Sequence, residues 1–316
     1  MARVWLIIDS SKNEKGKKLM KNEQSKGYLQ VLIAGLLWGT IGIWATLLGR
    51  MGMDSMSTAF FRLLSATLIL FIILVIKGKG FKYFRISKRG LISCMLIGFL
   101  SQALYNYFYM YAVQTTGMAV AAVLLYTSPI FVAVISRLVF KEQMNASKIT
   151  AIALNIAGCV LVVTGGSFTG VSISGMGVIM GVLAGFTYGL MPVLSRIGAD
   201  DKDAFTSAFY GLAFGALLLL FMAHPFTGIS FEFTLPMVLV LIGFGLIPSA
   251  LGYIVYFGGL SKIKETSKVP IFCSVENVAA AAFGFLIFSE SFTAAKVTGI
   301  ALVFLSIVIM NMKKKS

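Results

Sequence analysis

The chain has 316 residues, of which 58% are hydrophobic and only 12% are charged, and its formal net charge is +15. Soluble domains carry about 25% charged residues, so this composition excludes an ordinary soluble enzyme or binding domain. A basic chain can bind nucleic acid, but here the basic residues alternate with long apolar segments, which is the pattern of membrane topology.

The apolar segments predict an all-α membrane protein with ten transmembrane helices. About 20 apolar residues are needed to cross a hydrocarbon core of about 30 Å, whereas barrel strands of about 10 residues would alternate in polarity. We expect a disordered cytoplasmic tail at 1–27 and a basic tail at 313–316. The predicted spans are 28–48, 57–76, 91–111, 118–138, 148–165, 175–195, 204–223, 235–257, 267–288 and 294–312.

The basic residues lie almost entirely on one side of this scheme. Arg62 falls within the second span, and only Arg50 and Lys296 fall on the side opposite to the chain ends. The positive-inside rule therefore places both termini in the cytoplasm. We expect a multi-pass protein of the cell (plasma) membrane with no nucleic-acid partner.

The second five spans repeat the first five at an offset of about 146 to 149 residues. A duplicated unit with an odd number of spans must insert its second copy upside down. Two inverted five-helix repeats, at 28–165 and 175–312, are the plan of many secondary transporters. The aligned pairs include Gly35 with Gly181, Gly39 with Gly185, Arg50 with Arg196, Phe140 with Phe288, Glu142 with Glu290, and Lys148 with Lys296.

Two polar stripes occupy equivalent faces of the third and eighth spans. The four polar residues of the third span follow the spacing i, i+3, i+4 and i+7, which places them on one face of a helix. Polar groups are unfavourable against lipid, so these faces should point inward. The repeated placement favours a cavity lining over the alternative, interhelical hydrogen bonding without a ligand. The stripes are Gln102, Tyr105, Asn106 and Tyr109, and Ser249, Gly252, Tyr253 and Tyr256.

Two ionisable residues lie within spans, where a charge costs about 2.5–3.5 kcal/mol, and both are therefore candidates for function. We expect Glu276 to contact substrate or carry a proton; the alternative is a structural pair, with Arg62 as a possible partner. The alternative for Arg62 is a side chain that extends to the membrane surface. Glu142 and Glu290, at span ends, are expected to be solvated.

Small residues and prolines predict how the spans pack and bend. Glycines at every fourth position, in the first span and from Gly177 to Gly189 in the sixth, predict close helix packing; the alternative is ridges that slide during gating. Four prolines predict interruptions of spans or of their ends: Pro129, Pro192, Pro248 and Pro270. The three cysteines lie within spans and predict neither a disulfide nor a metal site.

Several short motifs resemble the EamA repeat of the drug/metabolite transporter superfamily. They are Gly35-Leu36-Leu37-Trp38-Gly39, Phe61-Arg62-Leu63, Pro129-Ile130-Phe131, and Glu142 with Ile149–Gly158, and Ser289–Thr293 with Gly299–Leu302 is similar to the second copy of the repeat ending. The resemblance covers nearly all of 28–312. It implies two inverted five-helix repeats around a central cavity, and export or exchange of metabolites, often amino acids. Relatives often carry Glu-Pro in the ninth span, whereas Glu276 is followed here by Asn277, so the resemblance leaves a helix break at this position open.

The sequence therefore predicts a secondary transporter of small metabolites that works by alternating access. The alternatives are a translocator of lipid or lipid-linked sugar on the same fold and, more remotely, an intramembrane enzyme. The single histidine, His224, has no catalytic or metal-binding partner motif, so we expect no catalytic residue, metal or cofactor. We expect a monomer or homodimer whose partners are a small-molecule substrate and the bilayer. The candidate substrate-binding residues are Trp38, Arg62, Gln102, Tyr105, Asn106, Tyr109, Ser249, Tyr253, Tyr256, Glu276 and Asn277.

Overall fold

The computed structural model describes residues 22–77, 84–167, 174–198, 203–226, 231–289, 291 and 293–312. Within these residues, ten helical segments are long and apolar enough to cross a bilayer, and they match the predicted spans. The first helix begins at Asn22, so residues 22–27, which we expected in the tail, are helical. Residues 1–21 and 313–316 lie outside the described residues.

The spans divide into the following elements, several of them interrupted. Span one comprises a helix over 22–38 and α2 (Ile41–Arg50), span two α3 (Ser55–Lys77), span three α4 (Lys88–Leu96), η2 (Ile97–Leu104) and α5 (Tyr105–Thr116), span four α6 (Met118–Leu125) and α7 (Ser128–Phe140), and span five α8 (Ala146–Thr164). Span six is α9 (Gly175–Ile197), span seven α10 (Ala204–Ala223), span eight α11 (Leu235–Phe244), η4 (Gly245–Leu251) and α12 (Gly252–Leu260), span nine η5 (Thr266–Lys268), α13 (Val269–Cys273) and α14 (Val275–Phe288), and span ten α15 (Ala294–Asn311).

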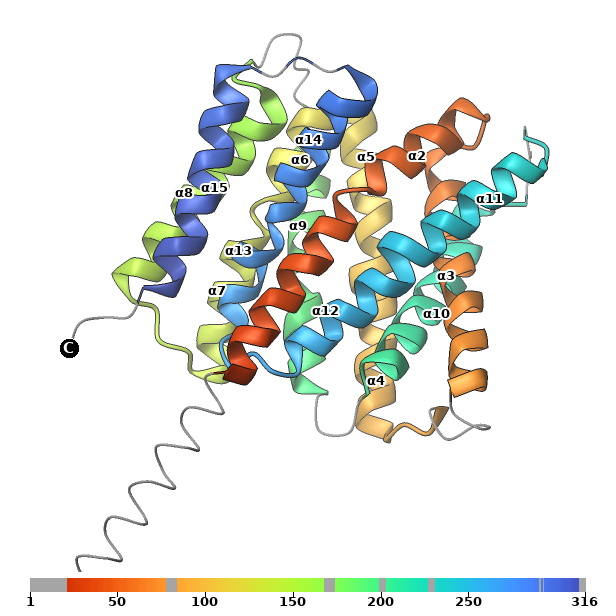
Figure 1. Cartoon of the computed structure of the whole chain (residues 1–316), viewed down its shortest axis with the longest axis horizontal. Coiled ribbons are helices and arrows are strands. Elements are labelled where there is room, and N and C mark those ends of the chain that lie inside the picture. The colour runs from red at the N-terminus through yellow and green to blue at the C-terminus, as the bar shows by residue number, and fades with distance from the viewer. Residues whose placement is uncertain are drawn as a thin grey trace, which may run out of the picture.

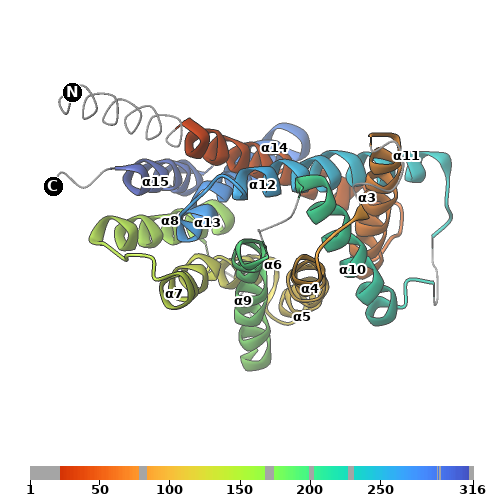
Figure 2. The ribbon, with the colours of Figure 1, turned by 90° about the horizontal axis from the view of Figure 1, so that it is seen from below.

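The spans form one bundle with equivalent pairs at its two edges (Figures 1 and 2). Spans five and ten, α8 and α15, pack extensively against each other at one edge, and spans two and seven, α3 and α10, pack at the other. Most of the remaining helices lie between these pairs, whereas α11 extends past α3. We call the lower end in Figure 1, where the helix over 22–38 begins and α15 ends, the basic end, and the other the opposite end.

Irregular backbone recurs at equivalent positions of the two repeats. Spans three and eight both contain a π-helical segment, η2 and η4, which is a rare conformation often found at functional sites. Span four is interrupted after α6, and span nine is interrupted at Ser274. Lys141 and Ser289, which end α7 and α14, both adopt the left-handed conformation with φ of 55°. The duplicated, inverted architecture predicted from the sequence is therefore confirmed.

The structure answers the open question of a break in span nine and corrects the expectation for Pro192. Span nine is broken at Ser274 although Asn277, and not proline, follows Glu276; Pro270 instead lies in the first turn of α13. Pro192 lies inside α9 without interrupting it. A helix break at the centre of a span is tolerated only where protein or water satisfies the freed backbone groups, so the break marks a polar interior.

The glycine ridges pack span one against span nine and span six against span four. A Cβ atom on Gly39 would lie 2.5 Å from Ala279 Cβ and 2.9 Å from the carbonyl oxygen of Glu276. A Cβ atom on Gly185 would lie 2.9 Å from the carbonyl oxygen of Leu124. Close packing through these glycines is confirmed, and it holds span one directly against the residues that surround Glu276.

Candidate functional site

Glu276 lies in the first turn of α14, immediately after the break in span nine. The N-terminus of a helix carries a partial positive charge and unpaired N–H groups, so it favours a carboxylate. The side chain is partly accessible because it lines a cavity of about 20 Å³, which has room for about one water molecule. The other lining residues are Tyr126, Ser128, Pro129, Asn155, Tyr188, Pro270, Cys273, Ser274 and Asn277.

Side chains from three other spans, four, five and six, complete this cavity. Tyr188 of span six lines the same cavity as Glu276. The Tyr126 hydroxyl donates to Asn277 Oδ1, and Asn277 Nδ2 donates to Cys159 Sγ at 3.2 Å. Asn155 Nδ2 donates to the Ser274 hydroxyl at 2.6 Å, directly at the break. The polar side chains around the break are thus fixed by one another.

Four residues in or beside this cavity were missed in the sequence analysis: three line it, and Cys159 accepts a hydrogen bond from Asn277. Tyr126, Asn155, Cys159 and Tyr188 come from spans four, five, five and six, and nothing local marks them as neighbours of Glu276. Two signals were available: Pro129, which begins α7 and so marks the break next to Tyr126, and the isolated amide of Asn155 within an apolar span.

Arg62 does not pair with Glu276. Its guanidinium lies 5.7 Å from the centroid of the Phe244 ring, and the residue is only 7% exposed, so it does not extend to the membrane surface either. Among the residues that the structure describes, no lysine or arginine forms an ion pair with Glu276.

The two polar stripes meet at the interface between the repeats. The Tyr253 hydroxyl donates to Gln102 Oε1 at 2.9 Å, which links spans eight and three. Asn106 Nδ2 donates to the Gln102 carbonyl at 2.5 Å, and the Ser249 hydroxyl donates to the Phe244 carbonyl at 3.0 Å. Asn106 and Ser249 therefore satisfy backbone groups in or beside the π-helical segments, which gives them a structural role.

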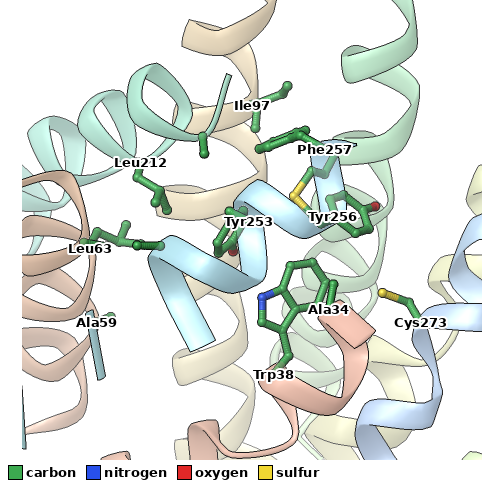
Figure 3. Packing of buried hydrophobic residues seen from close by; sticks show 14 of the residues in the cluster. Ala34, Trp38, Ala59, Leu63, Ile97, Leu212, Tyr253, Tyr256, Phe257 and Cys273 are labelled. Atoms are coloured by element: carbon green, nitrogen blue, oxygen red, sulfur yellow. The ribbon is translucent and has the colours of Figure 1, made fainter. Parts of the chain in front are cut away.

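The aromatic candidates form two groups of packed rings, and one of these groups includes Tyr188 of the Glu276 cavity. The Trp38 ring lies 5.1 Å from the Tyr253 ring and 4.9 Å from the Tyr256 ring (Figure 3). The Tyr105 ring lies 5.9 Å from Tyr109 and 5.3 Å from Tyr188. Trp38 Nε1 is buried and has no hydrogen-bond partner in the described part of the chain. The interior therefore combines aromatic faces with one unpaired N–H donor.

A larger cavity leads from the opposite end of the bundle toward this site. Its volume is about 410 Å³, and it is bounded by the parts of spans one, four, five, nine and ten nearest that end. Its lining includes Gly42, Met118 and Phe288, together with Tyr126 and Asn277, which also line the Glu276 cavity. The hydrogen-bonded pair Tyr126–Asn277 thus stands between this larger cavity and the carboxylate.

Glu142 corrects the expectation of a solvated charge at a span end. The residue is only 8% exposed, and its carboxylate accepts hydrogen bonds from the backbone N–H of Thr266 at 2.7 Å and of Ser267 at 3.2 Å. It also pairs with Arg196. Its repeat equivalent, Glu290, lies outside the described residues.

Comparisons with known proteins bear on the whole chain. The profile of the EamA-like transporter family matches residues 25–164 and again residues 175–312. An uncharacterized transporter of Archaeoglobus fulgidus is 26% identical over 90% of this chain and 95% of that protein. The uncharacterized transporter YoaV of Bacillus subtilis is 27% identical over 88% and 94%, and the uncharacterized inner membrane transporter YicL of Salmonella typhimurium is 24% identical over 92% and 96%.

The fold also matches a solved protein. A crystal structure superposes with a TM-score of 0.74 over 90% of this chain and 97% of that chain. The two sequences are 15% identical, so this likeness shows the fold alone.

Proposed function

Because the chain belongs to the EamA-like transporter family and is a multi-pass membrane transporter of small solutes, we propose that it is a secondary transporter that works by alternating access. It exports or exchanges small metabolites, and amino acids are the substrate class to test first. The inverted repeats support this mechanism, because in such folds the site lies at the repeat interface near the bilayer midplane.

The observation that carries the proposal is the environment of Glu276. A carboxylate at the centre of a bundle is costly, and this one lies at a helix break beside a cavity, without an ion-pair partner among the described residues. A structural carboxylate would be expected to have such a partner. Glu276 therefore contacts a substrate amine or carries a coupling proton.

The two ionisable residues within spans support a zwitterionic substrate. Arg62 is a cation in span two and Glu276 an acid in span nine, and they do not pair with each other. An amino acid presents a carboxylate and an ammonium group, and its side chain would lie among the aromatic rings. The unpaired Trp38 Nε1–H adds a donor to the same interior.

The location follows from the distribution of charge. We place both termini in the cytoplasm and the protein in the plasma membrane, because nearly all lysines and arginines outside the spans lie on the side of the chain ends. We further propose that the protein is a monomer or homodimer. The inner membrane named for the Salmonella typhimurium relative supports this placement.

Transport by purified protein in proteoliposomes tests the proposal. Radiolabelled amino acids should exchange across the membrane, and Glu276→Gln, which keeps shape and hydrogen bonding, should lower the rate by at least about tenfold, an effect of about 1.4 kcal/mol. Glu232→Gln is the matched control, because Glu232 is an exposed carboxylate between spans seven and eight. It should leave the rate unchanged.

Two outcomes would contradict the proposal. An unchanged rate for well-folded Glu276→Gln across the pH range would remove Glu276 from the mechanism. Movement of a lipid-linked sugar by the wild type, with no movement of amino acids, would instead support the lipid translocator.

A further inference from the structure

A cluster of charged and hydroxyl side chains joins the two repeats at the basic end. Its members, the inner cluster, are Glu142, Lys148, Arg196, Glu265, Thr266 and Ser267. The first two belong to the first repeat and the other four to the second. The cluster therefore ties the end of span four and the start of span five to the end of span six and the start of span nine.

Glu142 is the centre of the inner cluster. Its side chain is 5% exposed, and it pairs with Arg196 while it accepts from the backbone N–H groups that begin span nine. The Ser267 hydroxyl donates a further bond to Glu142 Oε2 at 2.5 Å. A buried carboxylate in this position satisfies the otherwise unpaired N–H groups of a helix start, and charge-assisted bonds of this type are the strong ones.

The two cations extend the cluster on either side of Glu142. Lys148 Nζ lies 3.8 Å from Glu142, 2.5 Å from Glu265 and 3.1 Å from the Ser267 hydroxyl, and its side chain is 6% exposed. Arg196 also donates to the Thr266 hydroxyl at 3.0 Å, and its guanidinium lies 4.0 Å from the centroid of the Phe140 ring. Most of these contacts cross between the repeats.

The two ends of the bundle differ in access. From the opposite end a cavity of about 410 Å³ reaches Tyr126 and Asn277 beside the central carboxylate. From the basic end a pocket of about 150 Å³ has Arg196 and Thr266 in its wall, and it shares no lining residue with the Glu276 cavity. Passage from Glu276 toward the basic end requires spans four and nine to separate there, and the inner cluster holds them together.

One contact beside the inner cluster recurs at the opposite end at a longer distance. Arg50 and Phe288 are the repeat equivalents of Arg196 and Phe140, and the Arg50 guanidinium lies 5.5 Å from the Phe288 ring, compared with 4.0 Å at the basic end. The inverted duplication thus places the same arginine–phenylalanine contact at both ends, and the contact is closer at the end where the inner cluster is assembled.

We propose that the inner cluster is the closed gate of the basic end, and that the Glu142–Arg196 pair must break each time the site opens to that side. The inference rests on the alternating-access mechanism proposed above. A buried ion pair adds little net stability compared with apolar packing, but it fixes one arrangement of the elements that it joins. Removal of either charge therefore shifts the equilibrium toward the form that is open at the basic end.

Distances between the repeats test the gate without any substrate. Cysteines at Gln143 and Ile197, both exposed and each adjacent to one partner of the pair, carry nitroxide labels, and dipolar broadening of their spectra reports short separations. The three native cysteines are buried. Glu142→Gln should raise the ratio of separated to close label pairs by about five- to a hundredfold. Glu23→Gln, which removes a carboxylate from an exposed pair with Lys26 at the same end, should leave the ratio unchanged.

Further variants keep the result decisive. Arg196→Gln should give the same shift, and the double variant little more, because both changes break one interaction. Ser267→Ala removes hydrogen bonds to Glu142 and Lys148 without leaving a charge unpaired, so it should fold and give a smaller shift of the same sign. Unchanged spectra in the three single variants, each correctly folded, would overturn the proposal that the inner cluster is a gate. Because no substrate is present, that result would leave the role of Glu276 to its own transport test.

Discussion

Tyr253 donates its hydroxyl proton to Gln102 Oε1 at 2.9 Å, and this bond joins the π-helical part of span three to the helix that follows the π-helical part of span eight. Both residues are buried, at 7% and 1% exposure. The bond crosses the interface between the repeats, next to the aromatic cluster around Trp38. It therefore fixes how two structurally irregular spans face each other at the centre of the bundle.

Tyr253→Phe should destabilise the protein by about 1–3 kcal/mol, because it leaves the buried Gln102 oxygen without its donor. Tyr256→Phe is the matched control: Tyr256 packs on the same Trp38 ring, but the structure records no hydrogen bond for its hydroxyl within the described residues. Thermal unfolding in detergent measures both. Equal effects of the two substitutions would show that the hydrogen bond contributes nothing.

Gly39→Ala should separate span one from span nine. The added Cβ would lie 2.5 Å from Ala279 Cβ and 2.9 Å from the Glu276 carbonyl oxygen, and the backbone cannot give way cheaply, so we expect a cost of about 1–3 kcal/mol and slower transport. Gly42→Ala, one turn further along, meets nothing within 4 Å and should be neutral or slightly stabilising. Unfolding midpoints and transport rates that do not distinguish the two variants would contradict this role of Gly39.

The spans could be predicted because lipid demands long apolar helices: α3 runs from Ser55 to Lys77, compared with the expected 57–76. The duplication could also be predicted, because residues such as Arg50 and Arg196 align between the two halves of the sequence. In the structure these two arginines make equivalent contacts with Phe288 and Phe140. Glu276 was identifiable because a carboxylate within a span is costly wherever its side chain points.

The rest of the site depends on packing that no local pattern encodes. Tyr126 and Tyr188 meet Glu276 only once spans four, six and nine have packed together. The π-helical segments have the same apolar composition as an ordinary α-helix, so the sequence of η2 does not predict its π-helical hydrogen bonding. Glu142 was misjudged because its burial is produced by Thr266, 124 residues further along the chain, while its sequence neighbours show only a polar span end.

The topology gives a direct labelling test. Ser261 lies at the basic end and Ser291 at the opposite end, and both are exposed. In intact cells, Ser291→Cys should react with a membrane-impermeant maleimide and Ser261→Cys should react only after lysis, because the basic loops face the cytoplasm. The parent protein, whose three cysteines are buried, is the control for background. The reverse pattern would invert the proposed orientation.

Glu265 should make the stability of the basic end depend on pH. It lies between α12 and η5, 2.5 Å from Lys148 and 3.1 Å from Lys268. Burial by itself raises the pKa of Glu265, but hydrogen bonding and charge from Lys148 and Lys268 outweigh it and hold the pKa below the ordinary value of 4.5. Because the folded-state pKa is lowered, ionised Glu265 stabilises the fold above pH 4.5, and this contribution is lost as the pH falls through the lowered pKa.

The comparison of wild type with Glu265→Gln isolates this contribution. The Glu265 side chain is 41% exposed, so the wild type should be more stable by only about 0.5–1 kcal/mol at pH 7, and the difference should vanish as the pH falls below 4.5. Glu142 also lies near Lys148, but it is present in both proteins, so its own titration cancels to first order in the difference. Unfolding midpoints measured from pH 7 to pH 3.5 give the curve. A difference that stays constant over this range would show that the Glu265 charge does not stabilise the basic end.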